Sequence, residues 1–554
     1  MNEACAAGDL NKIKYIHEQS LAGSEQSIAD NRMSYFNNED ACNNAAAGHL
    51  DCLKYLHEQK STEGNNIFPW NKQTCEIAAQ GHLECLKYLH DNNCPWDRRI
   101  CKFAARGHLD CLKYLHENRA IWDKEACDIA AQGHLECLIY LHNNGCPWDR
   151  QICEQAAQGH LDCLKYLHEK RCPWSKRICE QAAQGHLDCL KYLHEKRCLW
   201  DKRACKQAAQ GHLECLKYLH ENGCPWDKEA CENAAKGHLD CLKYLHENGC
   251  PWDKEACENA AKGHLDCLKY LHENGCPWSE QVCANAAKGH LNCLVYLHEN
   301  NYLWNKSAFT SASRGHLECL KYLHENECPW SAAICVHAAA EGHLDCLKYL
   351  HENGCPWNED TCINAAKGHL DCLIYLHENG CPWNVNVYAN AAKGHLECLK
   401  YLHENGCPWN EEACRYATEG HLDCLKYIHE QSLAKGEQSS TEDEYPWDGQ
   451  IYTYAAEGHL DCLKYLHEQS TAKGKNGCLW NENACVSAAK GHLDCLKYLH
   501  ENNCPWDEDA CTSAARGFLP CLKYLHNYGC PWDKRACIIA ARDHFACYSY
   551  LKTI

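Results

Sequence analysis

The chain is built from one repeated segment of 26 residues. Residues 224–249 read CPWDKEACENAAKGHLDCLKYLHENG, and residues 250–275 repeat this string without a change. Self-similarity at a fixed period indicates an array of stacked units, because a unit this short cannot bury its own apolar face. The repeat therefore predicts a solenoid, although ordinary scaling would divide a chain of 554 residues into about three or four globular domains.

The glycine of the motif A-A-x-G-H-L marks the units along the chain. It recurs from Gly8 to Gly517, and Asp543 takes its place in a final copy, which makes 20 units. The nine consecutive steps from Gly81 to Gly315 are 26 residues each. Four steps are longer by at least seven residues, and their extra polar residues follow the sequence HEQ, which predicts surface loops there, whereas the step to Gly342 gains one residue.

These spacings predict one continuous domain. We expect a single solenoid over residues 1–554, with a degenerate N-terminal cap and long loop at 1–40, a central regular array at 41–430, a polar loop insertion at 431–446, further repeats at 447–530 and a degenerate C-terminal cap at 531–554.

Each unit reads as two short α-helices. In residues 224–249, Asp227 follows a Pro-Trp turn and is a good N-cap for a first helix over roughly 228–236. Gly237 ends that helix. The segment from about 238 to 247 carries leucines at helical spacing, which predicts a second amphipathic helix.

The tryptophan of the turn has a candidate packing partner within its own unit. Trp226 stands just before the N-cap and Cys231 four residues after it, which is the spacing of a hydrophobic staple. Where the second member is not cysteine, it is Phe309, Tyr388 or Tyr452. We therefore expect this position to pack against the tryptophan of the same unit.

The string A-A-x-G-H-L-[DE]-C-L-K-Y-L resembles the ankyrin repeat, whose core reads A-A-x-x-G-H-L-E-V-V-K-L-L-L. The resemblance covers essentially all of residues 1–554 and recurs in the 20 units. Most units are shorter than an ankyrin repeat, and CPWD stands where the T-P-L-H opening would be. The resemblance implies an all-α solenoid of about 20 stacked ankyrin-like helix-turn-helix repeats, mostly lacking the β-hairpin finger. Arrays rich in Cys, Pro and Trp are similar to ankyrin proteins of large DNA viruses and protists, which suggests such an origin.

Charge and hydropathy narrow the partners. The net charge of −20 argues against nucleic acid, which requires a basic face, so we expect no nucleic-acid partner. No apolar stretch is long enough to cross a membrane, so we expect no membrane partner. The start, MNEACAAGDL, is not a signal peptide, which predicts an intracellular, cytoplasmic protein, in the host cytoplasm if viral. We expect a monomer with free thiols among its 50 cysteines.

Cysteine and histidine recur in every typical unit, as Cys224, Cys231, His238, Cys241 and His246. Zinc prefers such ligands, so a metal-binding or thiol-rich array is one alternative function. Other units replace several of these residues with aromatic rings, which favours structural cysteines instead. We expect no metal site, no cofactor and no catalytic residue, because these residues are copied many times whereas an active site is a single constellation. A self-assembling structural protein is a second alternative, against which the altered end units argue.

Cysteine pairing divides into two cases. Equivalent cysteines of neighbouring units would lie about 10 Å apart, which is too far for a disulfide. A bridge within one unit stays open if the compartment is oxidising.

Variation between units marks a candidate binding surface. The second helix hardly changes, whereas the position two residues after the first-helix cysteine varies widely. In ankyrin-like arrays the first helices line the binding face, and exposed aromatic residues are typical anchors. Runs of Gln or Asn at this position could instead record recent duplication, and the long polar loops at 18–38 and 431–445 are further candidates. We expect a non-catalytic protein–protein interaction scaffold that binds one or more proteins. The candidate partner-binding residues are Ile77, Phe103, Ile129, His337, Tyr416 and Tyr454.

Overall fold

The computed structural model describes residues 1–22, 38–60, 66–175, 177–302, 304, 306–331, 333–436, 449–472 and 480–554. Over these ranges the chain forms 40 α-helices and no strand, with one isolated β-bridge between Lys60 and Asn66. The helices alternate along the chain as the first and second members of pairs. The predicted all-α, helix-turn-helix array is therefore confirmed.

The first helices of the pairs are mostly five to eight residues long. They are α1 (Asn2–Ala6), α4 (Asn38–Ala46), α6 (Lys72–Ala78), α8 (Ile100–Ala104), α10 (Lys124–Ala130), α12 (Gln151–Ala156), α14 (Ile178–Ala182), α16 (Lys202–Ala208), α18 (Lys228–Ala234), α20 (Lys254–Ala260), α22 (Gln281–Ala286), α24 (Lys306–Ala312), α26 (Ala333–Ala340), α28 (Glu359–Ala365), α30 (Val385–Ala391), α32 (Glu411–Thr418), α34 (Gly449–Ala455), α36 (Glu482–Ala488), α38 (Glu508–Ala515) and α40 (Lys534–Ala540).

The second helices are nine residues long or longer. They are α2 (Leu10–Ala22), α5 (Leu50–Glu58), α7 (Leu83–Asp91), α9 (Leu109–Glu117), α11 (Leu135–Asn143), α13 (Leu161–Glu169), α15 (Leu187–Glu195), α17 (Leu213–Glu221), α19 (Leu239–Glu247), α21 (Leu265–Glu273), α23 (Leu291–Glu299), α25 (Leu317–Glu325), α27 (Leu344–Glu352), α29 (Leu370–Glu378), α31 (Leu396–Glu404), α33 (Leu422–Gly436), α35 (Leu460–Ala472), α37 (Leu493–Glu501), α39 (Leu519–Asn527) and α41 (Phe545–Thr553).

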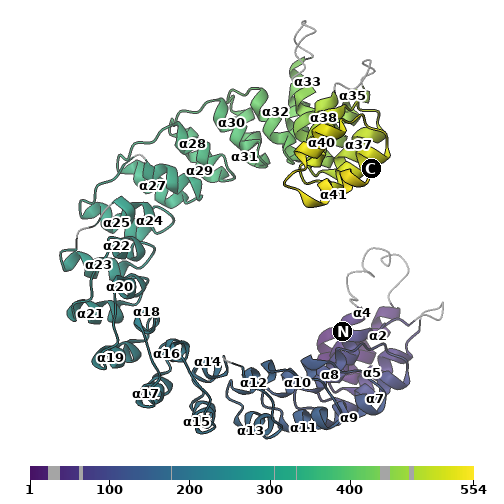
Figure 1. The fold of residues 1–554 in the computed structure, drawn as a ribbon, viewed down its shortest axis with the longest axis vertical. Coiled ribbons are helices and arrows are strands. Elements are labelled where there is room, and N and C mark those ends of the chain that lie inside the picture. Colours follow the sequence, from purple (N-terminus) through teal and green to yellow (C-terminus); the bar gives the residue numbers. More distant parts are fainter. Residues whose placement is uncertain are drawn as a thin grey trace. The chain divides into compact units, whose positions relative to one another are not determined.

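The helix pairs, called repeats from here on, form two compact units. One comprises residues 1–260 with 264–278, and the other residues 261–263 with 279–554. Within each unit a first helix packs against its own second helix and against the first helix of the next pair, while second helices pack against second helices (Figure 1). Each unit is therefore a row of helix pairs in two layers.

The pair α18–α19 shows how the repeat sequence makes this fold. The Asp227 side chain accepts a hydrogen bond from the Glu229 amide at 3.1 Å and caps α18, as predicted. Gly237 then turns the chain with a φ of +103°, a conformation that suits glycine. Helix α18 ends at Ala234, two residues before the predicted end, because the turn into the second helix begins at Ala235.

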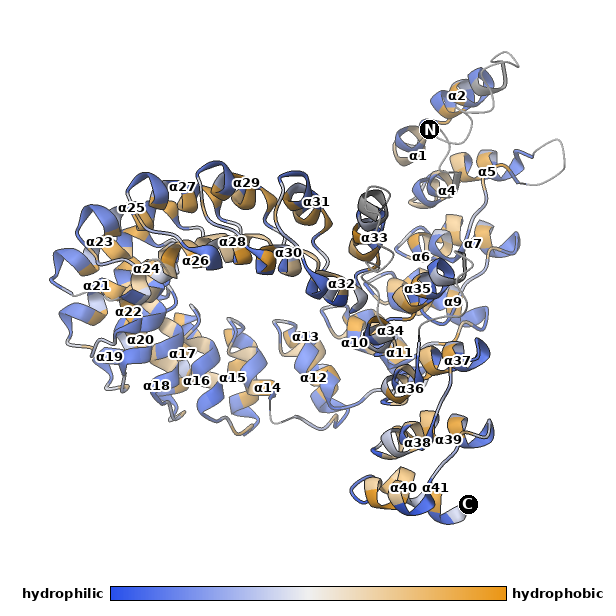
Figure 2. Cartoon of the chain, turned by 90° about the horizontal axis from the view of Figure 1, so that it is seen from above, coloured by the Kyte–Doolittle hydropathy of each residue, from blue (hydrophilic) through white to orange (hydrophobic). Residues whose placement is uncertain are grey.

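The core lies between the two layers and combines small residues with leucine. Helix α18 buries two alanines and Cys231, and α19 buries Leu242 and Leu245. Alanine and cysteine allow the helix axes to approach closely, so the leucines fill the space between them. Along α25–α31, hydrophilic residues cover the outer side of the second helices and hydrophobic residues face the first helices (Figure 2).

Three of the four longer repeats have extended second helices, whereas α5 keeps nine residues. Helices α2, α33 and α35 have 13, 15 and 13 residues, against nine in a regular repeat. The predicted loop at 431–446 begins as a continuation of α33 through Gly436, and its remaining residues lie outside the described ranges. Both predicted end caps contain helix pairs, α1–α2 and α40–α41. Across the described ranges, no helix has both the length and the apolar character that a bilayer crossing requires.

Candidate binding surface

In a regular repeat, three side chains join the second helix to the next second helix. The His246 Nδ1 atom lies 2.9 Å from the Tyr270 hydroxyl, and the His246 ring stacks on Trp252 at 3.9 Å between centroids. Trp252 in turn meets Tyr270 edge-on at 6.3 Å. The same hydrogen bond recurs in both units, at 2.9 Å between His90 and Tyr114 and at 2.8 Å between His377 and Tyr401. These histidines, tryptophans and tyrosines therefore serve contacts within the array.

In a regular repeat, the histidine that precedes the second helix packs on a glycine of the preceding repeat. A Cβ atom added to Gly211 would lie 2.9 Å from the His238 Nδ1 atom. Burial lowers the pKa of His238, and the neighbouring His264 and His212 lower it further. Where phenylalanine replaces this histidine, Phe518 takes the same place against Gly491. The position thus requires a flat ring beside a residue without a side chain.

The cysteines are internal hydrogen-bond donors. The Cys250 thiol donates to the carbonyl of Asp227, the N-cap residue of the preceding repeat, at 3.3 Å. Burial raises the pKa of the Cys241 thiol to about 11. Every cysteine in the described ranges is a free thiol, and Cys198 alone among them is more than marginally accessible. Over the same ranges, no group of three or more His, Cys, Asp or Glu side chains is arranged to hold a metal ion, so the geometry gives no support to the metal-binding alternative.

The predicted staple partner is wrong in register. Phe309, at the first-helix cysteine position, contacts Trp330 of the following repeat, with ring centroids 5.6 Å apart. Likewise the Cys231 thiol donates to the carbonyl of Cys250 in the following turn at 3.9 Å. The side chain at this position therefore packs against the turn of the next repeat and not against the tryptophan of its own repeat.

Several glutamines and asparagines at the variable first-helix position bond to the preceding repeat, whereas Asn364 and Asn390 donate to carbonyls of their own helix. The Gln132 side chain donates to the Gln155 side chain at 3.0 Å. The buried Asn233 donates to the Lys206 carbonyl at 3.3 Å, and Asn259 donates to the Glu232 carbonyl at 3.2 Å. These Gln and Asn residues stabilise the stack, which leaves the apolar and aromatic members as the candidates for binding.

The six predicted partner-binding residues all lie on first helices and are half-buried. Three belong to consecutive helices that pack together, one lies alone, and the last two belong to the neighbouring helices α32 and α34. They are Ile77 on α6, Phe103 on α8, Ile129 on α10, His337 on α26, Tyr416 on α32 and Tyr454 on α34.

Tyr416 and Tyr454 belong to a row of alternating cations and rings. The Lys393 Nζ atom lies 3.9 Å from the centre of the Tyr416 ring. The Arg415 guanidinium carbon lies 5.3 Å from the Tyr416 ring centre and 4.8 Å from the Tyr454 ring centre. We call Lys393, Tyr416, Arg415 and Tyr454 the tyrosine–arginine row. Sequence reasoning missed both cations, although Arg415 directly precedes Tyr416 and Lys393 stands two residues after the end of the preceding first helix, α30.

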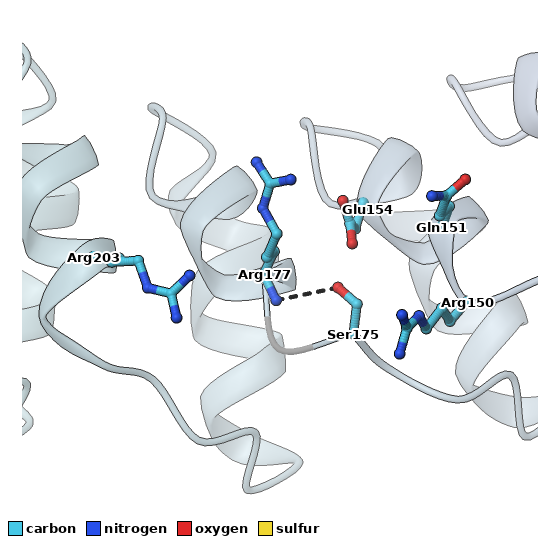
Figure 3. A pocket seen from close by; sticks show the side chains of 6 residues that line it. All are labelled: Arg150, Gln151, Glu154, Ser175, Arg177 and Arg203. Atoms are coloured by element: carbon cyan, nitrogen blue, oxygen red, sulfur yellow. Dashed lines mark hydrogen bonds between the residues drawn. The ribbon is translucent and has the colours of Figure 1, made fainter. Parts of the chain in front are cut away.

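A polar hollow of about 410 Å³ lies along α12, α14 and the start of α16. It is lined by Arg150, Gln151, Glu154, Ser175, Arg177 and Arg203 (Figure 3). The Arg203 guanidinium contacts the nearly buried Glu180 carboxylate at 3.2 Å, and Arg177 approaches the same carboxylate at 3.7 Å. Sequence analysis missed this hollow because its arginines come from three different repeats. The loop candidates at 18–38 and 431–445 lie largely outside the described ranges.

These features define a helical-repeat protein whose varied side chains are carried on its first helices. No known protein family and no curated protein matches the sequence. Among solved structures, the chain is similar to the pentatricopeptide repeat protein PPR10 in complex with an 18-nt psaJ RNA element, at 10% identity, 98% coverage of both chains and a TM-score of 0.29. A cysteine-to-serine variant of that protein, also in complex with RNA, gives the same values. PPR10 from maize matches at 11% identity, with 98% of this chain and 92% of that chain covered and a TM-score of 0.25.

The expectation that the chain binds no nucleic acid is contradicted, because two of these similar proteins are described in complex with RNA. The physical weakness of the expectation is one of scale. Net charge sums the whole surface, whereas phosphate binding depends on local cations. The polar hollow holds Arg150, Arg177 and Arg203 despite the net charge of −20. The exclusion is therefore withdrawn.

Proposed function

We propose that this chain is a non-catalytic scaffold that binds a partner protein through its first helices. One observation carries the proposal. The second helices and turns repeat the same internal contacts from pair to pair, as at His246 and Tyr270, whereas the variable first-helix position is half-buried in most repeats and changes its chemistry. Side chains that are accessible and free to vary are the ones that can distinguish partners.

The tyrosine–arginine row is the proposed anchor of the surface. Tyrosine and arginine are the residue types that most often dominate binding energy at protein interfaces. The neighbouring cations hold the Tyr416 and Tyr454 rings in place before binding, which reduces the entropy lost on association. Ile77, Phe103 and Ile129 would provide a second, apolar contact on α6, α8 and α10.

We also propose that the helix pairs are trimmed ankyrin-like repeats and that the protein works in the cytoplasm. The first idea is supported by the motif A-A-x-G-H-L, which forms the junction between the two helices of a pair. The second is supported by the 50 cysteines, since a chain this rich in unpaired thiols suits a reducing compartment.

The test is site-specific photo-crosslinking in cells that produce the full chain. A benzophenone amino acid replaces Tyr454 in one variant and Tyr528 in the control variant. Tyr528 lies at the end of the second helix α39 and is 59% exposed. We expect protease-sensitive adducts at position 454 and few at 528. Equal adducts at both positions would reject the first-helix surface, and nuclease-sensitive adducts at 454 would replace the protein partner with a nucleic acid.

A further inference from the structure

One pair of thiols differs from its counterparts along the array. Cys179 lies in α14, and Cys198 lies in the turn that precedes α16. Their sulfur atoms are 3.3 Å apart, and the Cys179 thiol donates a hydrogen bond to Cys198. An S–S bond measures about 2.05 Å, so closing the gap requires a movement of roughly 1.3 Å.

Access to solvent separates this pair from the others. In the described ranges, Cys198 is the only cysteine that is half-buried; every other one is buried. It is also the only described turn cysteine that is not followed by proline, since Leu199 stands there and is 89% exposed. In regular turns such as that of Cys224, the thiol donates to an N-cap carbonyl, whereas the Cys198 thiol faces Cys179.

We propose that Cys198 and Cys179 form a peroxide-reactive site that closes to a reversible disulfide between consecutive repeats. The Cys198 thiolate attacks one oxygen of a peroxide, which breaks the O–O bond and gives a sulfenic acid and hydroxide. The Cys179 sulfur then attacks the sulfenic sulfur, loses its proton and displaces water. The sum is two thiols and one hydrogen peroxide converted to one disulfide and two waters, and a dithiol reductant reverses the change.

The local electrostatics favour this division of roles. The hydrogen bond from Cys179 lowers the pKa of the Cys198 thiol, and the same bond, together with burial, raises the pKa of Cys179. The accessible thiol is therefore the one that ionises more easily, which is what the attacking residue needs. Cys179 is buried and suits the resolving role, because it reacts only with a sulfur already beside it.

The array contains a matched control for accessibility. Cys335 and Cys355 place their sulfur atoms 3.4 Å apart in the same structural positions, but both are buried. If close sulfur atoms alone were sufficient, this pair would oxidise as fast as Cys179 and Cys198. If accessibility decides, Cys355 should react at least tenfold more slowly.

The experiment uses the full chain, reduced, freed of reductant and exposed to hydrogen peroxide, after which remaining thiols are alkylated. Trypsin releases Cys198 in the peptide CLWDK (198–202), which occurs once in the chain, and Cys179 in residues 178–191. We expect the disulfide-linked pair of these peptides to form first and to disappear on treatment with dithiothreitol. The variant C189A should keep the link, because Cys189 is the other cysteine of the longer peptide.

Two variants make the outcome decisive. Leu199→Pro restores the regular turn and should slow oxidation of Cys198 by about tenfold, and C179A should let Cys198 oxidise without forming the link. Circular dichroism confirms that each variant is folded. The proposal is overturned if Cys198 reacts no faster than Cys355, if Cys198 links to another cysteine, or if it accumulates only as sulfinic acid while Cys179 stays alkylated.

Discussion

The Nδ1 atom of His246 and the hydroxyl of Tyr270 lie 2.9 Å apart and join two consecutive second helices. Because both residues are copied along the chain, the same bond recurs from repeat to repeat in each unit. It ties neighbouring pairs together on the layer opposite the varied first helices. The second helices can therefore stay uniform while the first helices change.

Removing one hydroxyl should weaken one junction. In Tyr270→Phe the His246 ring loses its hydrogen-bond partner, and we expect a loss of about 1 kcal/mol at this junction. Hydrogen exchange should show faster amide exchange in α19 and α21 than in the native chain. The exposed Tyr528→Phe is the control and should change nothing beyond its own helix. Unchanged exchange in α19 and α21 would show that stacking on Trp252 alone holds the junction.

The two glycines of a repeat should respond differently to substitution. Gly237 has a φ of +103°, and a Cβ there would lie 2.8 Å from the His264 Nδ1 atom, so Gly237→Ala should cost roughly 2–3 kcal/mol. Gly249 has a φ of +78° with open space around it, and other repeats place Asn93 or Asn503 at this position with positive φ. Gly249→Asn should therefore stay within about 0.5 kcal/mol. Urea unfolding followed by circular dichroism compares the two, and equal losses would contradict the role given to His264.

Acid should destabilise the array through the histidines that precede the second helices. Burial, and after it neighbouring histidines, lower the pKa of His186 and His238 in the folded state. Below the unfolded value of about 6.5, the unfolded chain then binds more protons than the folded one, so stability is present above that pH and is lost as pH falls through it. We expect the urea concentration at the midpoint of unfolding to decrease as the pH is lowered from about 7.5 to about 5.

Phenylalanine offers a matched test of this acid effect, because Phe518 already occupies the same position in one repeat. A variant with His186→Phe and His238→Phe should fold and should lose less stability over the same pH range. An undiminished acid loss in this variant would assign the effect to other groups.

Binding should depend on the tyrosine–arginine row. Replacing Tyr416 and Tyr454 with alanine should lower the affinity for the captured partner at least tenfold, because truncating an anchor residue costs roughly 2 kcal/mol or more of binding free energy. The thermal midpoint should change little, since each cation–ring contact contributes about 0.5–1 kcal/mol. Glu247→Ala, on the exposed side of α19, is the control. Titration calorimetry with the partner from crosslinking gives both affinities, and equal affinities for the three chains would place the site elsewhere.

Much of the local architecture followed from one repeat. The N-cap at Asp227, the turn at Gly237 and the buried Leu242 and Leu245 were all predicted, because caps, glycine turns and helical periodicity act within a few residues. The staple at Trp226 failed for the opposite reason. The first-helix cysteine, or the ring that replaces it, contacts the following repeat. That contact depends on how repeats stack and not on residue spacing within one repeat.

The candidate surface was predicted only in part. The sequence pointed to Tyr416 and Tyr454, but the contacts of their rings with Lys393 and Arg415 depend on how consecutive repeats pack. The Gln and Asn residues looked like candidates or copying traces, and the structure assigns Gln155 and Asn233 to bonds between repeats. The polar hollow had no sequence signal, since each arginine occupies an ordinary place in its own repeat.

The sequence by itself determined the two helices of each repeat, their caps and the leucines that face inward. These features depend on interactions within about 26 residues. The tertiary structure alone decided which side chains meet across repeats. It placed His246 against Tyr270, His238 against Gly211, and Cys179 beside Cys198. The pattern within one repeat does not show which of its side chains contact the neighbouring repeat, because those contacts are set by the packing of one repeat against the next.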